Sequence, residues 1–286
     1  MTTYMITGAT GQLGRLVLDH LLKTVAPADV AVLVRSDEAK AEFDARGVSA
    51  RIGDYSDPAS LETALDGVDR FLLISGSEVG ARVPQHRNVI KAAKARGVEF
   101  IAYTSILDAA HSPLMLAREH KATEEMLAES GIPHTLLRNG WYSENLGMAV
   151  GGALAMGQHF GAAKDGRFSY ATRNDYAEAA AIVLTGGHDG AVLELGGDAA
   201  FTQTEVAALL TELSGTTVSY VDMPEEAYED ALVGAGLPEG LAAMLADSDA
   251  GAATGALFDD SRTLSGLIGR PTTPLADTIK AVLAAG

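Results

Sequence analysis

The chain contains no cysteine, which excludes disulfides, thiolate metal ligands and a cysteine nucleophile. Basic residues are also scarce, with 21 Lys and Arg against 38 Asp and Glu and a formal net charge of −17. Because so acidic a surface repels a phosphate backbone, we expect no nucleic-acid partner. The sequence has neither a basic N-terminal segment followed by an apolar run nor a stretch of ~18 consecutive apolar residues. We therefore expect a cytoplasmic protein with no membrane span.

Hydrophobic residues make up 47% of the 286 positions, enough for a sizeable core in one or two domains. The most informative stretch holds Gly8, Gly11 and Gly14, which follow the apolar run Tyr4–Ile6. From Leu13 onward, apolar residues recur at helical spacing. A strand, a glycine turn and a helix in this order are typical of a dinucleotide-binding site. The turn lets the backbone approach a pyrophosphate, and the N–H groups at the helix start bind it.

Strand and helix signals alternate through the first half of the chain. Apolar runs predict further strands at residues 29–34, 50–53, 70–74, 98–105 and 134–137. Strands that are apolar throughout and separated by helices predict an α/β fold, a doubly wound parallel sheet of Rossmann type, with ligands at the carboxyl ends of the strands. We expect this NAD(P)-binding domain to cover residues 1–145. A smaller C-terminal α/β lobe, residues 146–286, is expected to contribute late elements to the sheet as well.

The second half is less regular and rich in Ala and Gly. Thr202–Glu205 reads as a capping box that starts a helix. Val192–Leu195 is a candidate for one of the last strands of the sheet. We expect the glycine pairs at residues 151–152 and 186–187 to mark turns.

The residue at the end of the second strand distinguishes NAD-binding from NADP-binding sites. An acidic residue there hydrogen-bonds the ribose 2′-hydroxyl of NAD, whereas an arginine binds the 2′-phosphate of NADP. This sequence has Arg35 at that position. Arginine binds phosphate through charge-assisted, bidentate hydrogen bonds, so we expect NADPH. Asp37, two residues further on, could serve a ribose instead, which leaves NADH possible.

The acid–base pair of many short-chain dehydrogenases, Tyr-x-x-x-Lys on the helix after the fifth strand, is missing. If His120 takes the lysine position, the tyrosine position is Leu116. The sequence also lacks a Gly-x-Ser-x-Gly elbow and any His, Asp and Glu cluster with metal-ligand spacing. These absences argue against a hydrolase and against a metalloenzyme.

Runs spread over almost the whole chain carry a family resemblance. They are residues 8–14, 35, 75–80, 84–90, 103–105, 138–145, 171–176, 245–249 and 257–261. These runs resemble the NmrA-like, atypical short-chain dehydrogenase family, and within it the bacterial quinone reductases. The resemblance implies a Rossmann domain with a small C-terminal lobe, NADPH as the donor and a quinone as the small-molecule acceptor. We expect neither a flavin nor a metal.

Position by position, the resemblance implies cofactor contacts across the chain. The expected cofactor-binding residues are Gly8, Ala9, Thr10, Gly11, Gln12, Leu13, Arg35, Ser75, Gly76, Ser77, Asn139, Gly140, Trp141, Tyr142, Ser143, Glu144 and Arg173. His120 stands where the family has a lysine, and Ser105 where it has its usual serine. A hydrogen-bond donor near the developing oxyanion can suffice for quinone reduction, and we assign that role to His120 or Tyr142.

Two other functions remain open from the sequence. NmrA-like proteins include non-catalytic regulators that bind NAD(P) and act through a protein partner, and the loss of Tyr-x-x-x-Lys fits such a redox sensor. A reductase or isomerase acting on another carbonyl or enone would need a positioned acid or base. The chain is expected to be a monomer or a homodimer.

Overall fold

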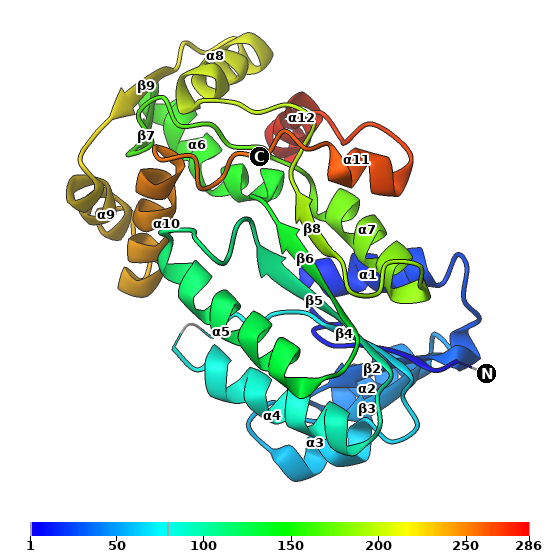
Figure 1. Cartoon of the computed structure of the whole chain (residues 1–286). Helices are drawn as coiled ribbons and strands as arrows, with labels where there is room; N and C mark the ends of the chain where they lie inside the picture. Colours follow the sequence, from blue (N-terminus) through cyan, green and yellow to red (C-terminus); the bar gives the residue numbers. More distant parts are fainter. Residues whose placement is uncertain (1, 79, 286) are drawn as a thin grey trace. The chain divides into compact units, whose positions relative to one another are not determined.

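The computed structural model describes residues 2–78 and 80–285 (Figure 1). The chain folds into two compact units, each assembled from separate stretches. Unit 1 is drawn from Met1–Ile106, Arg118–Arg138 and Arg173–Leu193, and unit 2 from Leu107–Ala117, Asn139–Thr172 and Glu194–Gly286.

The sheet that runs through unit 1 is built from apolar strands. Its strands are β1 (Tyr4–Ile6), β2 (Val30–Val34), β3 (Ser49–Ile52), β4 (Arg70–Leu73), β5 (Phe100–Ile106), β6 (His134–Asn139) and β8 (Val192–Leu195). They lie in the order β3-β2-β1-β4-β5-β6-β8. The pairs β1–β2, β1–β4, β2–β3 and β4–β5 are parallel, with Tyr4 level with Val30 on one side and with Arg70 on the other. This strand order is that of a Rossmann fold, so the expected fold class is confirmed.

Helices cover both faces of this sheet (Figure 1). They are α1 (Gln12–Leu21), α2 (Asp37–Asp44), α3 (Pro58–Ala64), α4 (Arg82–Ala95), α5 (Met115–Ser130) and α7 (Arg173–Thr185). On one face α1 and α7 pack against each other. On the other, side chains of α3, α4 and α5 such as Leu61, Val89 and Leu127 share a buried core with Phe71 and Ile101 of the strands. Burial of both faces explains why the central strands β2 and β5 are buried at every position, whereas β3 and β8 at the two ends of the sheet keep exposed residues.

Unit 2 is a smaller α/β assembly around two parallel strands, β7 (Gln158–Gly161) and β9 (Ser219–Asp222). Its helices are α6 (Gly147–Met156), α8 (Gln203–Ser214), α9 (Glu225–Gly234), α10 (Glu239–Ala252), α11 (Thr263–Ile268) and α12 (Leu275–Ala285). The expected capping box is present at the start of α8. The Glu205 N–H donates to Thr202 Oγ1 at 3.1 Å, and the Thr202 N–H donates to Glu205 Oε2 at 2.7 Å.

The expectation of a turn at Gly151 and Gly152 is wrong, because both residues lie inside α6. Glycine in a helix interior costs roughly 0.5–1 kcal/mol relative to alanine. Val150 and Ala153 of the same helix are buried, and α6 packs against β7 and α12. Tertiary packing therefore outweighs the low helix propensity of the two glycines. The residues at 186–187 do form a turn, with φ of +124° and +87°.

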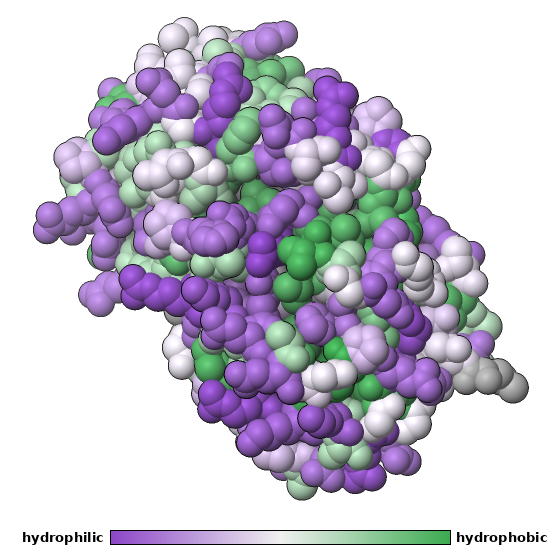
Figure 2. Space-filling view, viewed as in Figure 1, coloured by the Kyte–Doolittle hydropathy of each residue, from purple (hydrophilic) through white to green (hydrophobic). Residues whose placement is uncertain are grey.

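Hydrophilic residues cover most of the face shown in Figure 2, in keeping with the net charge of −17. Among residues 2–78 and 80–285, no helix combines the length and the apolar character needed to cross a membrane. Within the same residues, no group of three or more His, Asp or Glu side chains is arranged to hold a metal ion.

Candidate functional site

The glycine turn after β1 favours glycine at two positions, at Gly8 because of its backbone conformation and at Gly14 because of lack of space. Gly8 has a φ of +61°, in the left-handed region that favours glycine. A Cβ on Gly14 would lie only 2.2 Å from the Gly8 carbonyl oxygen, so α1 begins in direct contact with the turn. The Gly11 N–H closes the turn by donating to the Gly8 carbonyl at 2.9 Å.

The start of α1 offers backbone donors to a ligand. Among the described residues, no side chain caps this helix at Gly11, so the N–H groups of its first turn have no side-chain partner. Ala9, Thr10, Gln12 and Leu13, the other expected contacts, complete the turn and the start of the helix. A helix N-terminus of this kind binds an anion such as a pyrophosphate.

Arg35 lies directly after β2 with its side chain 74% exposed. Its Nη1 is 3.6 Å from Oε1 of Glu78, which is also exposed. The next residue, Ser36, caps α2 by accepting the Ala39 N–H at 3.2 Å. A guanidinium held at the end of the second strand and open to solvent suits a 2′-phosphate.

Two side chains of α4 hold the expected cofactor loop at residues 75–77 by hydrogen bonds to its backbone. The Gly76 N–H donates to His86 Nε2 at 3.1 Å, and Arg82 Nε donates to the Gly76 carbonyl at 2.8 Å. Burial lowers the pKa of His86 to about 3, so its imidazole is neutral. Because Nε2 accepts, the proton sits on Nδ1 and is donated to Thr123 Oγ1 at 3.0 Å.

A buried ion pair holds the same loop further along. Arg82 Nη1 lies 3.1 Å from Oε2 of Glu119 on α5, and both side chains are largely buried. Oε1 of Glu119 accepts the Gly80 N–H at 2.9 Å. Residue types and spacing do not point to Arg82 or Glu119, since the two lie on different helices and meet only in the folded chain.

His120, one of the two expected hydrogen-bond donors, is buried on α5. Its Nδ1 lies 2.8 Å from the hydroxyl oxygen of Tyr103 on β5. Burial lowers the pKa of His120 well below its ordinary value, with Arg82 and His86 adding to the effect, so the imidazole is neutral. Burial raises the pKa of Tyr103, and its hydroxyl can therefore donate to Nδ1, which places the ring proton on Nε2. The donor role stays a prediction.

Ser105, the other expected catalytic residue of unit 1, lies buried on β5. Its hydroxyl donates to Oε1 of Glu124 at 2.6 Å. Glu124 also forms a bidentate pair with Arg138, whose Nε and Nη2 lie 3.0 and 2.6 Å from the two carboxylate oxygens. Ser105 thus has a structural partner of its own, and its catalytic role stays a prediction.

The segment from Asn139 to Glu144 belongs to unit 2, where main-chain bonds fix it. The Gly140 N–H donates to the Leu195 carbonyl at 2.8 Å, and the Ser143 N–H donates to the Ala171 carbonyl at 2.9 Å. Oδ1 of Asn139 and Oγ of Ser143 are buried and have no hydrogen-bond partner among the described residues. Two unsatisfied polar atoms in one short segment suggest partners outside the chain, such as ordered water or a ligand.

The remaining residues expected to contact the cofactor lie near the ends of helices and strands. Trp141 and Tyr142 follow β6, Glu144 lies in the 3₁₀ helix Ser143–Leu146, and Arg173 is the first residue of α7 in unit 1.

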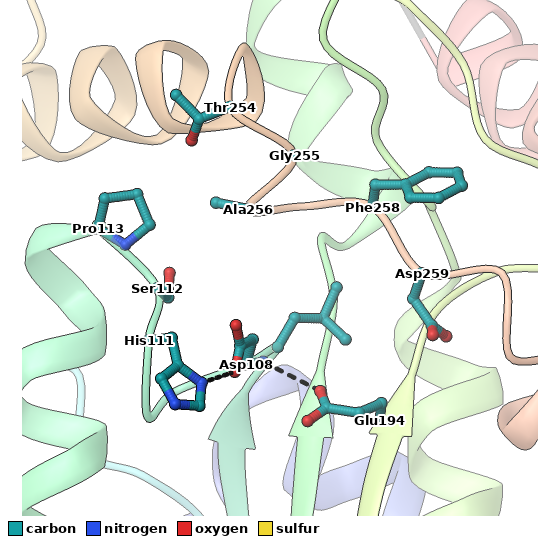
Figure 3. A pocket seen from close by; sticks show the side chains of 11 residues that line it. Asp108, His111, Ser112, Pro113, Glu194, Thr254, Gly255, Ala256, Phe258 and Asp259 are labelled. Carbon is teal, nitrogen blue, oxygen red and sulfur yellow. Dashed lines mark hydrogen bonds and ion pairs between the residues drawn. The ribbon is translucent and has the colours of Figure 1, made fainter.

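Unit 2 contains a cavity of about 400 Å³ (Figure 3). It is lined by Leu107, Asp108, His111, Ser112 and Pro113 after β5, by Glu194 of β8, and by Thr254, Gly255, Ala256, Phe258 and Asp259 after α10. Residue types and spacing do not reveal this cavity, although Phe258 and Asp259 lie in one of the runs that carry the family resemblance.

A family model described as NAD(P)H-binding matches residues 8–186. An NmrA-like family domain-containing oxidoreductase of Aspergillus flavus is 30% identical over 241 residues, covering 80% of this chain and 76% of its own. The chain belongs to the NAD(P)H-binding, NmrA-like family. Quinone oxidoreductase 2 of Escherichia coli (strain K12) is a family relative with 56% identity over 275 residues, or 96% of each chain.

The fold comparison agrees with the family assignment. The crystal structure of the E. coli NADPH-dependent quinone oxidoreductase in complex with NADPH superposes with a TM-score of 0.96. The aligned parts are 55% identical and cover 98% of this chain and 100% of that one. The resemblance drawn from the sequence is therefore confirmed, and this member of the family is homologous to a quinone oxidoreductase over 98% of its residues.

Proposed function

We propose that this chain is an NADPH-dependent quinone oxidoreductase that works without a flavin or a metal. The observation that carries the proposal is the 56% identity to E. coli quinone oxidoreductase 2 over 96% of both chains. At this identity over 96% of both chains, we expect the two proteins to share their fold and the type of loops that face the ligands.

The residues of unit 1 fit the cofactor. Because Gly14 has no side chain, the start of α1 can lie against the glycine turn. The backbone N–H groups there have no side-chain cap, which suits binding of the pyrophosphate. Arg35 is exposed at the end of β2, where it would bind the 2′-phosphate. Gly76 belongs to a loop whose position neutral His86 maintains.

NADPH, when bound, supplies a hydride, which a quinone accepts directly at its electron-poor ring. No flavin or metal is needed for this transfer, because the hydroquinone anion that results is stabilised by its own ring. Neutral His120 would act as an N–H donor toward an oxyanion and not as a charged acid. The unsatisfied oxygens of Asn139 and Ser143 remain candidates for polar ligand contacts.

The test is NADPH oxidation followed at 340 nm with a simple benzoquinone, using protein freed of any flavin. We expect turnover that neither added flavin nor a metal chelator changes. Tight NADPH binding without turnover on any quinone would contradict the proposal and favour the redox sensor.

Replacing Arg35 with alanine should lower kcat/KM for NADPH about 10- to 100-fold, because one charge-assisted hydrogen-bonding partner contributes roughly 1.5–3 kcal/mol. The value for NADH should change less than about twofold, since NADH has no 2′-phosphate to lose a partner. Initial rates with each cofactor at a fixed quinone concentration measure both effects.

Glu78→Gln is the matched variant for this prediction. It removes the carboxylate 3.6 Å from Arg35 and should leave NADH unaffected while raising the preference for NADPH. Equal losses with NADPH and NADH in Arg35→Ala would show that Arg35 supports the fold and does not read the phosphate.

A further inference from the structure

The lining of the cavity in unit 2 is connected by main-chain hydrogen bonds to the segment expected to contact the cofactor. The Leu107 N–H, at the start of the cavity lining, donates to the Asn139 carbonyl at 3.2 Å. Glu194 lines the cavity, and the next residue, Leu195, accepts the Gly140 N–H at 2.8 Å. Two parts of the lining are therefore joined by main-chain hydrogen bonds to residues 139–140.

The size and the apolar part of the lining suit a flat aromatic molecule. About 400 Å³ lies within the range of small-ligand pockets. Leu107, Pro113 and Ala256 supply apolar surface, and Phe258 lies at the edge of the lining, with its ring directed away from the other lining residues in the view of Figure 3. A mainly apolar wall with a few polar groups is typical of sites for small organic ligands, and a quinone ring suits such a wall.

The polar part of the lining is acidic. Asp108, Glu194 and Asp259 line the cavity together with His111, and none of the lining residues is Lys or Arg. Asp108 lies between His111 and Glu194 (Figure 3). Its Oδ1 is 2.9 Å from His111 Nδ1, and its backbone N–H donates to Glu194 Oε2 at 3.0 Å. These bonds hold the carboxylates in place at the cavity.

The backbone at Asp108 is strained, with a φ of +43°. Residues other than glycine are uncommon in this region, and such strain gathers where a site needs a particular side chain. Asp and Asn adopt it most readily, so replacement by Asn should keep the local fold.

We propose that this cavity holds the electron acceptor and that its carboxylates select uncharged or cationic quinones over anionic ones. The inference rests on the proposed function. The quinone gains a hydride as NADPH is oxidised to NADP⁺, and a proton from water completes the hydroquinone. The negative lining favours that protonation, so the product leaves uncharged.

The test compares three naphthoquinones of the same ring system, one uncharged, one with a sulfonate and one with a quaternary ammonium group. At low salt, kcat/KM should be at least about tenfold lower for the sulfonate than for the uncharged quinone. The double variant Asp108→Asn/Glu194→Gln should reduce that ratio threefold or more. Glu226→Gln/Asp230→Asn on the exposed side of α9 removes the same charge and should leave the ratio unchanged.

Binding gives a readout without turnover. With NADP⁺ present no hydride is available, and quenching of Trp141, the single tryptophan of the chain, reports the Kd of each quinone. The Kd values should follow the same order as kcat/KM. Ala256→Phe, which fills the cavity, should raise all three Kd values at least tenfold and leave the Kd of NADPH unchanged.

The outcomes separate the two proposals. Equal kcat/KM for the three quinones, with both cavity variants like the wild type, would overturn the acceptor site and leave the quinone reductase in place. Absence of turnover with every quinone, despite NADPH binding, would overturn the proposed function and this inference with it.

Discussion

Gly14→Ala is expected to abolish NADPH binding, raising its Kd at least about 100-fold, because an added methyl group has no space. The Cβ would lie 2.2 Å from the Gly8 carbonyl oxygen, 2.7 Å from the Gly8 carbonyl carbon and 2.9 Å from the Ala9 Cα. All three atoms are backbone, so no side chain can rotate out of the way. The start of α1 must move away from the turn, and the pyrophosphate loses the N–H groups of both. A titration of NADPH fluorescence measures the Kd.

Gly151→Ala is the matched control for this substitution. Gly151 lies inside α6, and apart from its chain neighbours and the backbone of its own helix a Cβ there would meet no atom of the described residues within 4 Å. Alanine should therefore stabilise the helix by roughly 0.5–1 kcal/mol without changing NADPH binding. A Gly14→Ala variant that binds NADPH within a few fold of the wild type would contradict the close contact between α1 and the turn.

Unit 1 could be predicted from the sequence because its signals are local. Strands buried on both faces are continuous apolar runs, and Gly8 and Gly14 mark the turn that we expect to approach a phosphate. Unit 2 could be predicted only in part. The capping box at Thr202 is local and was found, whereas β7 and β9 pair across more than fifty residues. Their stability comes from that pairing and from the helices around them, which no short window of sequence contains.

In the candidate site, too, only residues with a local sequence signal could be predicted. Arg35 could be found because its position is fixed relative to a strand end. The partner of Ser105 is Glu124 on a different element, and Glu124 in turn pairs with Arg138. The cavity of unit 2 joins Asp108 to Phe258, 150 positions apart in the chain. Contacts of this range depend on the packing of the fold, so residue types and spacing cannot reveal them.

Asp249→Asn is expected to stabilise the protein at neutral and alkaline pH. Asp249 is buried on α10, and its Oδ2 accepts the Ala162 N–H at 3.0 Å. Burial raises the pKa of this carboxyl from 3.8 to about 7, and the nearby charge of Asp222 adds to the effect. The folded chain therefore holds a proton on Asp249 at pH values at which the unfolded chain has lost it.

The sign of the pH dependence follows from this difference. Because the folded pKa is raised, the contribution of Asp249 to stability is fully present below about pH 4 and is lost as the pH rises through about 7. A shift of about three pKa units corresponds to at most about 4 kcal/mol. Asparagine keeps an acceptor for the Ala162 N–H and carries no charge, so the variant avoids this loss.

Urea unfolding at pH 4 and at pH 8 measures the effect. The free energy of unfolding of Asp249→Asn should match the wild type near pH 4 and exceed it by a few kcal/mol, up to the limit of about 4 kcal/mol, at pH 8. Asp230→Asn, an exposed residue of α9, removes the same charge and should change stability by less than about 0.5 kcal/mol at both pH values. A gain of equal size at pH 4 and pH 8 would mean that asparagine improves the packing around Ala162 and that the charge of Asp249 costs the fold little.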